Sequence, residues 1–553
     1  MKILSSIALL LLLFLNTHTS SAQLLDGENG NYDRADSLRG SLRPERTNYD
    51  VLKYNLNVKV VPEKKYIEGF NEITFEVKDR LPKMQLDLFA NMNVDSIVFQ
   101  GQILPYKREF NVVFIKFSDP LQAGQKQKLR FYYSGNPKVA KRPPWDGGFI
   151  FRKDKNGKPW VSVAVQGTGA SLWYPNKDHL SDEPEEAEIH VAAPNGLMNV
   201  SNGRLVGSEK MDKGYTRWDW KVENPINNYN IILNIGDYVH FSDKFEDLDL
   251  NYYVLSYNLE KAKKQFQQVK PMMACFTEKF GPYPFPEDSY KLVQTPYLGM
   301  EHQSAVAYGN QFSNGYYGRD LSGTGIGLRW DYIIIHESGH EWFGNSISVG
   351  DIADMWIHEG FTTYSEAVYV ECQYGKKDAL KYLKGLSQNA QNDKPIIGDF
   401  GVNNEGSGDM YFKGANMLNT LRSIIDNDEK WWDLLKNFSL DFRHKITNTQ
   451  EVIDYFNTRT ETDVEPLFRQ YLSYSALPKL HLKRVEDKIL ARWETDVKKF
   501  EVPVDLIVSK GEKIRVHPTN EWKALSKLSN KPGLKLSDVK LDRLHFYVQI
   551  EKD

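Results

Sequence analysis

The sequence contains little of what marks several common classes of protein. Its 553 residues include only two cysteines, Cys275 and Cys372, which excludes a small scaffold held together by many disulfides. The formal net charge is only −3, so charge gives no reason to expect nucleic acid or an acidic membrane surface as a partner. No internal repeat or low-complexity tract is present. Apolar residues make up 41% of the chain, which is typical of a well-packed globular protein.

The first 22 residues differ from the rest of the chain. Lys2 supplies a positive charge, residues 7–15 form a short apolar run, and Ser20 and Ala22 form a small-x-small cleavage site. The alternative is a membrane anchor, but the run is short for a bilayer span, and no later apolar stretch is long enough. We therefore predict a signal peptide, no stable membrane span after its cleavage, and export to the periplasm or the extracellular space.

The two cysteines lie in segments with helical character. Export would permit a disulfide between them, but nothing in the sequence shows that they meet. We expect Cys275 and Cys372 to be buried free thiols.

Hydrophobic periodicity divides the remainder of the chain into parts. Residues 23–48 are polar and are expected to form a flexible leader. Alternating runs such as "YNLNVKV" predict an all-β domain over 49–245. Helical periodicity dominates 246–473, and short alternating runs return over 474–553, where we expect a small β-sandwich. The prediction is a multidomain α+β protein, because one core does not extend over this length.

The segment "IIIHESGHEW" contains the first candidate for chemistry. A helix places residues i and i+4 on one face, so His336 and His340 direct two imidazoles at one point. Zinc binds neutral imidazole nitrogens and takes three protein ligands plus a water when it is catalytic. Glu337 can then reach that water without binding the metal. The alternative is that two histidines stand four apart by chance.

A third ligand is found in the next predicted helix, within "DMWIHEGFTTYSEAVYVECQYG". This helix begins 14 residues past His340 and carries Glu359. An isolated glutamate is most often a solvated helix residue. The apolar neighbours of Glu359 argue against a fully exposed face: Trp356, Ile357 and Phe361. Glu366 lies seven residues further on the same face, where a carboxylate can orient a ligand histidine from behind.

The combination of "HESGH", eighteen intervening residues and "EGF" resembles the zinc signature of the aminopeptidase N and leukotriene-hydrolase family. This resemblance implies that His336, His340 and Glu359 bind one zinc ion per chain. It also implies that Glu337 is the general base and later the proton donor.

The segment "YLGMEHQ" resembles the exopeptidase motif of that family, Gly-x-Met-Glu-Asn. Met300 and Glu301 match it, whereas Leu298 replaces the usual Gly and His302 the usual Asn. The resemblance implies that Glu301 binds the free α-amine of the substrate, with Gly299, Met300 and His302 beside it. We expect the two replacements to affect the contacts with the substrate's backbone and the preference for its side chain, without changing the reaction.

Two further matches complete the expected site, and the second is the weaker. "YFKGANML" resembles the family's Tyr-x-Lys-Gly segment, which implies that Tyr411 donates a hydrogen bond to the developing oxyanion. Without that resemblance, Tyr411 would be an ordinary residue of an amphipathic helix. "QGTGASLWYP" keeps the spacing of a family stretch that implies a place for Gln166 in the first side-chain pocket, although the usual Arg and Cys are absent.

The family's plan is a saddle-like β domain, a thermolysin-like and mainly helical catalytic domain, and a β-sandwich. Many members add a large C-terminal helical domain that covers the cleft. This sequence ends directly after its last strand-like runs, so we expect no such domain here and a more open cleft.

The leading hypothesis is an exported zinc aminopeptidase acting on peptides with a free N-terminus. A second hypothesis keeps the zinc site but predicts endopeptidase or other hydrolase chemistry, because His302 and the absent helical domain alter the cleft. A third is an inactive peptidase-like binding protein. The sequence makes no prediction about the preferred N-terminal residue or the oligomeric state.

Overall fold

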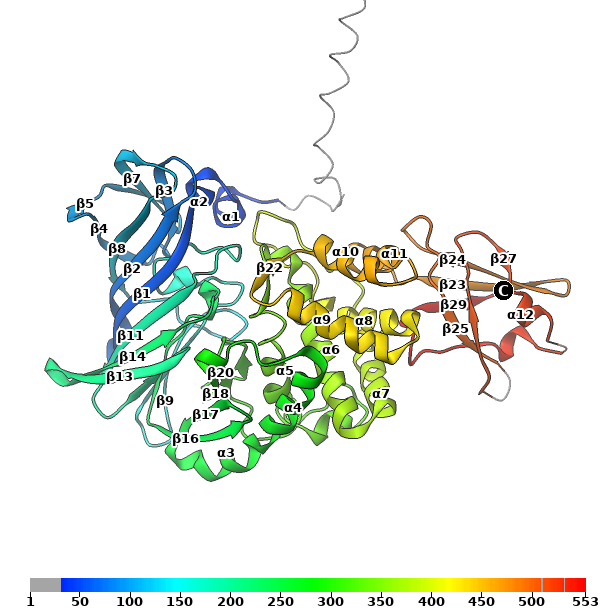
Figure 1. The fold of residues 1–553 in the computed structure, drawn as a ribbon. Helices are drawn as coiled ribbons and strands as arrows, with labels where there is room; N and C mark the ends of the chain where they lie inside the picture. The colour runs from blue at the N-terminus through cyan, green and yellow to red at the C-terminus, as the bar shows by residue number, and fades with distance from the viewer. Residues whose placement is uncertain (1–30, 509–510, 532) are drawn as a thin grey trace, which may run out of the picture.

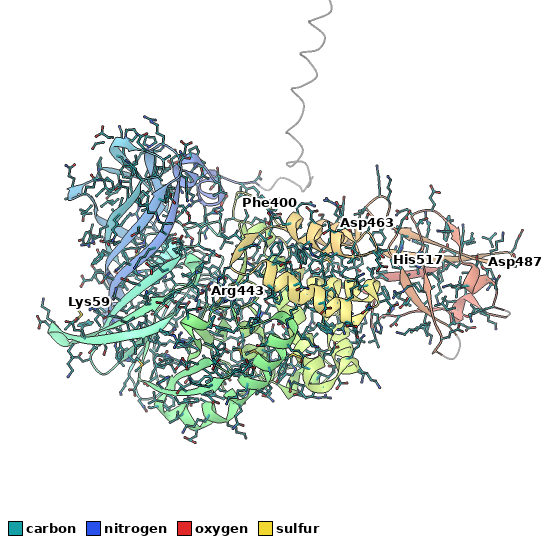
Figure 2. All side chains as sticks on the ribbon, viewed as in Figure 1. Lys59, Phe400, Arg443, Asp463, Asp487 and His517 are labelled. Atoms are coloured by element: carbon teal, nitrogen blue, oxygen red, sulfur yellow. A yellow bond between two sulfur atoms is a disulfide. The ribbon has the colours of Figure 1, made fainter. Side chains whose placement is uncertain are left out.

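The computed structural model describes residues 31–508, 511–531 and 533–553. These residues form three parts in a row: a strand-rich N-terminal part, a central part dominated by helices, and a small strand-rich C-terminal part (Figure 1). Side chains fill the space between the elements of each part (Figure 2). Within the described ranges, no helix is both long enough and apolar enough to cross a bilayer. The predicted signal peptide lies outside the described residues.

Three sheets build the N-terminal part. The largest has eight strands in the order β13-β14-β11-β1-β2-β8-β4-β5, and smaller sheets have the orders β3-β7-β6 and β12-β15-β10-β9. Over residues 54–60 of β1 every second side chain is buried, as the alternation in the sequence predicts. The strands are β1 (Tyr49–Val61), β2 (Tyr66–Val77), β3 (Leu81–Asp87), β4 (Met92–Phe99), β5 (Gln102–Ile103), β6 (Tyr106–Glu109), β7 (Val112–Leu121), β8 (Lys126–Gly135), β9 (Gly148–Lys153), β10 (Pro159–Ala164), β11 (Glu186–Pro194), β12 (Met198–Val200), β13 (Arg204–Met211), β14 (Tyr215–Val222) and β15 (Asn234–Gly236).

Part of the segment expected to be a flexible leader is ordered. It forms α1 (Arg34–Gly40) and α2 (Pro44–Thr47), and α1 begins at Asp33, whose carboxylate accepts hydrogen bonds from two backbone amides. Arg46 is fully buried and pairs with Asp87 on β3 at 2.7 Å. The sequence indicated a leader because this stretch is polar, but the partner of its buried arginine lies in a distant strand.

A five-stranded sheet forms the boundary between two cores. It has the order β16-β17-β18-β20-β19, with β16 (Tyr238–Phe245), β17 (Leu248–Leu255), β18 (Tyr290–Gln294), β19 (Gly299–Met300) and β20 (Val306–Tyr308). On β17, Tyr253 and Leu255 pack into the N-terminal core, whereas Leu250 and Tyr252 pack into the helical core. Both faces of this sheet are therefore buried.

The predicted domain boundary at residue 245 falls inside this sheet. β16 pairs with β17 along its whole length, so the boundary lies before Tyr238 rather than after Phe245. The strands on either side of the true boundary have the same alternating pattern, and sequence periodicity does not reveal which sheet a strand joins.

The central part packs its helices against that sheet. They are α3 (Leu259–Gln265), α4 (Val269–Phe280), α5 (Tyr332–Gly339), α6 (Trp356–Tyr374), α7 (Lys376–Leu386), α8 (Phe412–Ile425), α9 (Asp428–Asp441), α10 (Thr449–Arg459) and α11 (Glu465–Ser473), with the short parallel pair β21 (Ile347–Val349) and β22 (Lys445–Thr447). The C-terminal part adds two small sheets, β27-β24-β23-β29 and β26-β25-β28. Its elements are β23 (Lys479–Val485), β24 (Lys488–Glu494), β25 (Val504–Ile507), β26 (Lys513–Val516), β27 (Lys523–Ala524), α12 (Ser526–Ser529), β28 (Lys540–Leu541) and β29 (Gln549–Lys552).

The two cysteines form a disulfide, so the expectation of free thiols was wrong. Cys275 on α4 and Cys372 on α6 are 97 residues apart in the chain, and their Cα atoms are 6.0 Å apart. Helical periodicity shows that each cysteine faces inward, but it does not show that α4 and α6 pack side by side.

Replacing both cysteines by alanine should lower the free energy of unfolding by about 2–4 kcal/mol, because the bond restricts a long loop of the unfolded chain. Denaturant unfolding of the Cys275→Ala/Cys372→Ala protein measures this difference. Treating the native protein with reductant should reproduce most of the loss, while the double variant should not respond to reductant. Equal stability with and without the bond would contradict the prediction.

Candidate metal and active site

The helix that carries the histidines begins at a strongly held cap. The carboxylate of Asp331 accepts hydrogen bonds from the backbone amides of Ile333 at 3.1 Å and Ile334 at 3.4 Å, at the start of α5. Asp331 is itself fixed by three donors from neighbouring segments: Gln265 at 2.7 Å, Tyr308 at 2.7 Å and Asn310 at 2.8 Å. Burial raises the pKa of Asp331 to about 6. This cap sets where α5 starts, and hence where the histidines of its last turn point.

Helices α5 and α6 bring the three predicted metal ligands together. The Nε2 atom of His336 lies 3.6 Å from Oε2 of Glu359, and that of His340 lies 3.3 Å from the same oxygen. Each residue offers a ligand atom within 4.8 Å of the others, and all three are buried. Two imidazole nitrogens and one carboxylate oxygen therefore face a common point.

The Nδ1 atom of each imidazole, on the side away from Nε2, makes a hydrogen bond to the protein. Nδ1 of His336 donates to Oε1 of Glu366 at 2.7 Å, and the second oxygen of Glu366 accepts from the hydroxyl of Tyr382 at 2.6 Å. Nδ1 of His340 donates to the carbonyl of Phe343 at 3.0 Å. With Nδ1 carrying the proton in these bonds, the neutral form of each imidazole has the lone pair of Nε2 free to bind a metal. The contact predicted for Glu366 is present.

The donor set fits zinc. Two imidazoles and one carboxylate are the ligands of many catalytic zinc sites, and they leave a fourth position open. Oε2 of Glu359 is buried and makes no hydrogen bond within the described part of the chain, which is unfavourable unless a cation neutralises it. Glu301, Glu337 and His340 form a second cluster of possible ligands, but it has one nitrogen donor and shares His340 with the first. We therefore assign the metal to His336, His340 and Glu359.

Glu337 faces the cleft from the same helix. It lies against Gly299, where an added Cβ atom would come within 2.9 Å of its carboxylate and within 2.8 Å of Ile333. Only glycine fits at position 299, so the motif's glycine provides room for the carboxylate. Burial raises the pKa of Glu337 to about 7, which suits a group that accepts and returns a proton near neutral pH.

Glu301 is buried at the edge of the same cleft, and two parts of the chain hold it. Its Oε1 atom accepts hydrogen bonds from the amide of Gln166 and, at 3.2 Å, from the hydroxyl of Tyr229, both in the N-terminal part. Its backbone carbonyl accepts from the amide of Asn345 at 2.7 Å, just beyond the zinc helix. Asn345 in turn accepts from Asn230 at 2.8 Å. The structure thus brings Gln166 and Glu301 into direct contact.

The sequence analysis missed Tyr229, Asn230 and Asn345. Asn345 stands five residues past His340, and this closeness in sequence to a predicted ligand is a signal that could have pointed to it. Nothing in the local sequence around Tyr229 and Asn230 indicates the cleft. Their position depends on how the N-terminal part folds against the helices.

The remaining predicted residues fall into two groups. Tyr411 and Met300 line the cleft, and the ring of Tyr411 lies 6.2 Å from that of His336, centroid to centroid. Burial raises the pKa of Tyr411 well above its ordinary value, so its hydroxyl keeps its proton and remains a donor. His302 does not line the cleft: it is fully buried, and burial lowers its pKa to about 3. Both of its ring nitrogens are buried without a hydrogen-bond partner in the described part of the chain, and the cleft lining gives no support to its predicted contact with substrate.

The cleft has a volume of about 900 Å³ and carries excess negative charge. Its lining includes the carboxylates of Glu301, Glu337, Glu359 and Glu405, and in the described part of the chain Lys394 is the only lysine or arginine that lines it. Burial raises the pKa of Glu301 and of Glu337, as expected for carboxylates without cationic partners. The site is therefore suited to cations.

Replacing Glu366 by glutamine should weaken zinc binding about 10- to 100-fold, because the carboxylate that orients His336 and strengthens its donor nitrogen is lost. Competition with a chelator of known affinity measures this without any assay of activity. Tyr382→Phe removes the hydroxyl that holds Glu366 and should give a smaller effect. Unchanged zinc affinity in the Glu366→Gln protein would show that this contact does not support the metal.

The chain is similar to known aminopeptidases. It is 22% identical to endoplasmic reticulum aminopeptidase 1 of Mus musculus over 378 residues, which cover 65% of this chain and 38% of the relative. It is 20% identical to aminopeptidase N of Haemophilus influenzae over 341 residues, covering 58% of this chain and 38% of that protein. The matched region thus spans less than half the length of these curated relatives.

Solved structures share the fold. A two-domain M1 zinc metallopeptidase bound to L-tryptophan superposes with a TM-score of 0.67 at 20% identity, covering 80% of this chain and 98% of the other. An M1 zinc metallopeptidase of Deinococcus radiodurans bound to a Tyr-Ser-Ala substrate gives a TM-score of 0.64 at 20% identity, with the same coverage. Residues 264–471, which include the three ligands, Glu337, Glu301 and Tyr411, match the Peptidase family M1 domain. These residues therefore match peptidase family M1, and the M1 metallopeptidases among the structural neighbours are described as zinc enzymes.

Proposed function

We propose that this protein is a zinc-dependent aminopeptidase that hydrolyses the N-terminal peptide bond of peptides. The observation that carries the proposal is the placement of Glu301, a buried carboxylate without a cationic partner, in the same cleft as the zinc ligands and Glu337. A free α-ammonium group is the cation that such a carboxylate would bind in a peptide substrate.

Each residue around the metal site has a separate role in hydrolysis. Zinc held by His336, His340 and Glu359 supplies Lewis-acid chemistry, polarising a carbonyl and lowering the pKa of a water molecule. Glu337 removes the proton of the attacking water and delivers it to the nitrogen of the leaving amine. The hydroxyl of Tyr411 donates a hydrogen bond to the oxygen that becomes negative as the carbonyl is attacked.

The amine anchor determines which bond is cut. Gln166 and Tyr229 donate to one oxygen of Glu301 and hold the carboxylate in one orientation. Asn345 holds the backbone of the same residue. Because Glu301 lies close to Glu337 and His340, an ammonium bound there would place the first peptide bond beside the residues that would hold zinc. Fixed placement of this kind accounts for much of an enzyme's rate. An endopeptidase has no use for such an anchor.

Similarity to other proteins supports the same function. The relatives described above are aminopeptidases, and one of the structural neighbours was solved with a tripeptide, Tyr-Ser-Ala. In this chain, the ligands, the proton-transfer group and the amine anchor all lie at one cleft, which favours an active enzyme over an inactive binding protein.

The proposal includes export to the periplasm or the extracellular space. It is supported by the signal-like first 22 residues and by the disulfide between Cys275 and Cys372. Disulfides form and persist in oxidising compartments and are rare in the reducing cytosol. Sequencing the N-terminus of the protein recovered outside the cytoplasm tests this part of the proposal, since an intact N-terminus would contradict it.

Replacing Glu337 by glutamine should reduce hydrolysis of aminoacyl anilides by at least about 10²- to 10⁴-fold, the usual contribution of general acid–base catalysis. The variant should keep one zinc ion per chain, because Glu337 is not a ligand. Glu278→Gln, an exposed carboxylate on α4, is the matched control and should retain full activity. Normal hydrolysis by the Glu337→Gln protein would overturn the mechanism.

Replacing Glu301 by glutamine should lower kcat/KM for a peptide with a free N-terminus by about 10- to 100-fold, the loss of a hydrogen bond to a charged group. Hydrolysis of the same peptide with an acetylated N-terminus should be slow in the native protein and no slower in the variant. If the native protein cleaves both peptides equally well, the amine-anchored function is wrong and the endopeptidase hypothesis is favoured.

A further inference from the structure

An exposed tryptophan lines the active cleft. Trp145 leaves 66% of its surface open, yet it borders the same cleft as Glu301 and Gln166. Single exposed apolar side chains are common on protein surfaces and need no explanation. This one differs because an indole offers a large flat apolar face at a place where substrate must pass.

The loop that carries Trp145 is held rigidly. The carboxylate of Asp146 accepts hydrogen bonds from the backbone amides of Lys141 at 2.6 Å and Arg142 at 2.9 Å. The backbone carbonyl of Asp146 accepts from the side chain of Lys138 at 2.5 Å and from that of Thr168 at 3.3 Å.

Gly147, the residue after Asp146, packs closely against Thr168. Gly147 has φ of +57°, and a Cβ atom there would come within 2.2 Å of the hydroxyl oxygen of Thr168. These contacts hold the backbone that carries Trp145 in place, which lowers the backbone entropy lost when a ligand binds there.

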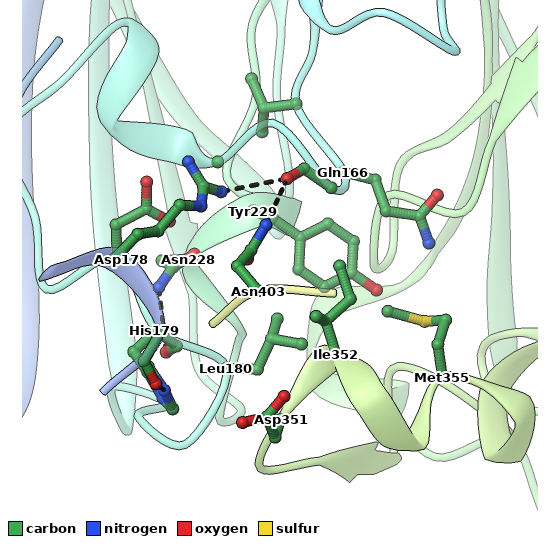
Figure 3. A pocket seen from close by; sticks show the side chains of 15 residues that line it. Gln166, Asp178, His179, Leu180, Asn228, Tyr229, Asp351, Ile352, Met355 and Asn403 are labelled. Carbon is green, nitrogen blue, oxygen red and sulfur yellow. Dashed lines mark hydrogen bonds between the residues drawn. The ribbon is translucent and has the colours of Figure 1, made fainter. Parts of the chain in front are cut away.

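The contacts of this loop place Trp145 at the amine end of the cleft. Thr168, which holds the loop, lies two residues past Gln166, the donor to Glu301. Between them, the carbonyl of Gly167 accepts from Arg39 at 3.0 Å and from Asn403 at 3.3 Å (Figure 3). The stretch from Gln166 to Thr168 is thus clamped by α1 on one side and by the loop before α8 on the other.

The side chain of a peptide's first residue leaves the chain at the atom next to its amine. We propose that Trp145, with Pro144 beside it, forms an apolar subsite for that first side chain and favours aromatic and large aliphatic residues. Leu298 and Met300 add apolar surface to the same cleft. The inference rests on the proposed function, because it uses Glu301 as the anchor of the amine.

Binding to an inactive protein tests the subsite separately from catalysis. The zinc-loaded Glu337→Gln protein is titrated calorimetrically with the tripeptides Phe-Ala-Ala, Ala-Phe-Ala and Ala-Ala-Ala. Adding Trp145→Ala should weaken the binding of Phe-Ala-Ala about 10-fold and leave the other two peptides unchanged. Trp145→Phe should keep most of the affinity, because it preserves an aromatic face. Tyr106→Ala, an exposed aromatic residue of the N-terminal part outside the cleft, is the matched control and should change nothing.

Several results would overturn the inference. The inference is wrong if Trp145→Ala weakens the binding of all three peptides equally, or of none. It is also wrong if only the binding of Ala-Phe-Ala weakens, or if Trp145 makes the protein prefer Arg-Ala-Ala to Phe-Ala-Ala. Acetylated Phe-Ala-Ala separates this inference from the function beneath it. If acetylation leaves binding unchanged but the effect of Trp145 persists at the first position, the amine anchor fails and the subsite stands. If acetylation abolishes binding but Trp145→Ala has no effect, the subsite alone fails.

Discussion

Uncompensated negative charge in a buried cleft is the constraint on which the site depends. Glu301, Glu337 and Glu359 are each nearly inaccessible to water, and no arginine in the described part of the chain lines the cleft beside them. Carboxylates placed in this way are unfavourable unless they lose their charge or acquire a cation. Two imidazoles face the carboxylate of Glu359, and in the proposed function the ammonium group of a substrate neutralises the carboxylate of Glu301.

The folded chain uses positions far apart in sequence to keep that arrangement in place. Asp331 fixes the start of α5, Glu366 orients His336, and Asn345 ties the zinc helix to the backbone of Glu301. Tyr229 and Gln166 reach the same carboxylate from the N-terminal part. The five-stranded sheet makes this possible, because its two faces belong to two different cores, and the cleft lies where these cores meet.

Much of the metal site could be predicted from local spacing, because a helix has a fixed period. The interval of four between His336 and His340, and of seven between Glu359 and Glu366, placed each pair on one face without knowledge of the fold. Other predictions failed because no local rule applied to them. Cys275 and Cys372 face each other only because α4 and α6 are neighbours, and the buried Arg46 pairs with Asp87 of a distant strand. His302 was expected at the substrate, but it is fully buried and does not line the cleft, whereas its neighbour Glu301 does.

The sequence by itself determined that His336 and His340 face one point, that Glu359 and Glu366 share one face of a helix, and that strand-rich parts flank a helical part. These features follow from hydrophobic and helical periodicity, whereas the roles of zinc ligand and proton-transfer group were implied by the resemblance of these residues to a known family. Only the tertiary structure decided which side chains from different parts of the chain meet. Tyr229 and Gln166 meet Glu301, Trp145 lines the same cleft, and Cys275 pairs with Cys372. Such contacts depend on how sheets and helices pack over long sequence separations, and no short interval in the chain encodes that packing.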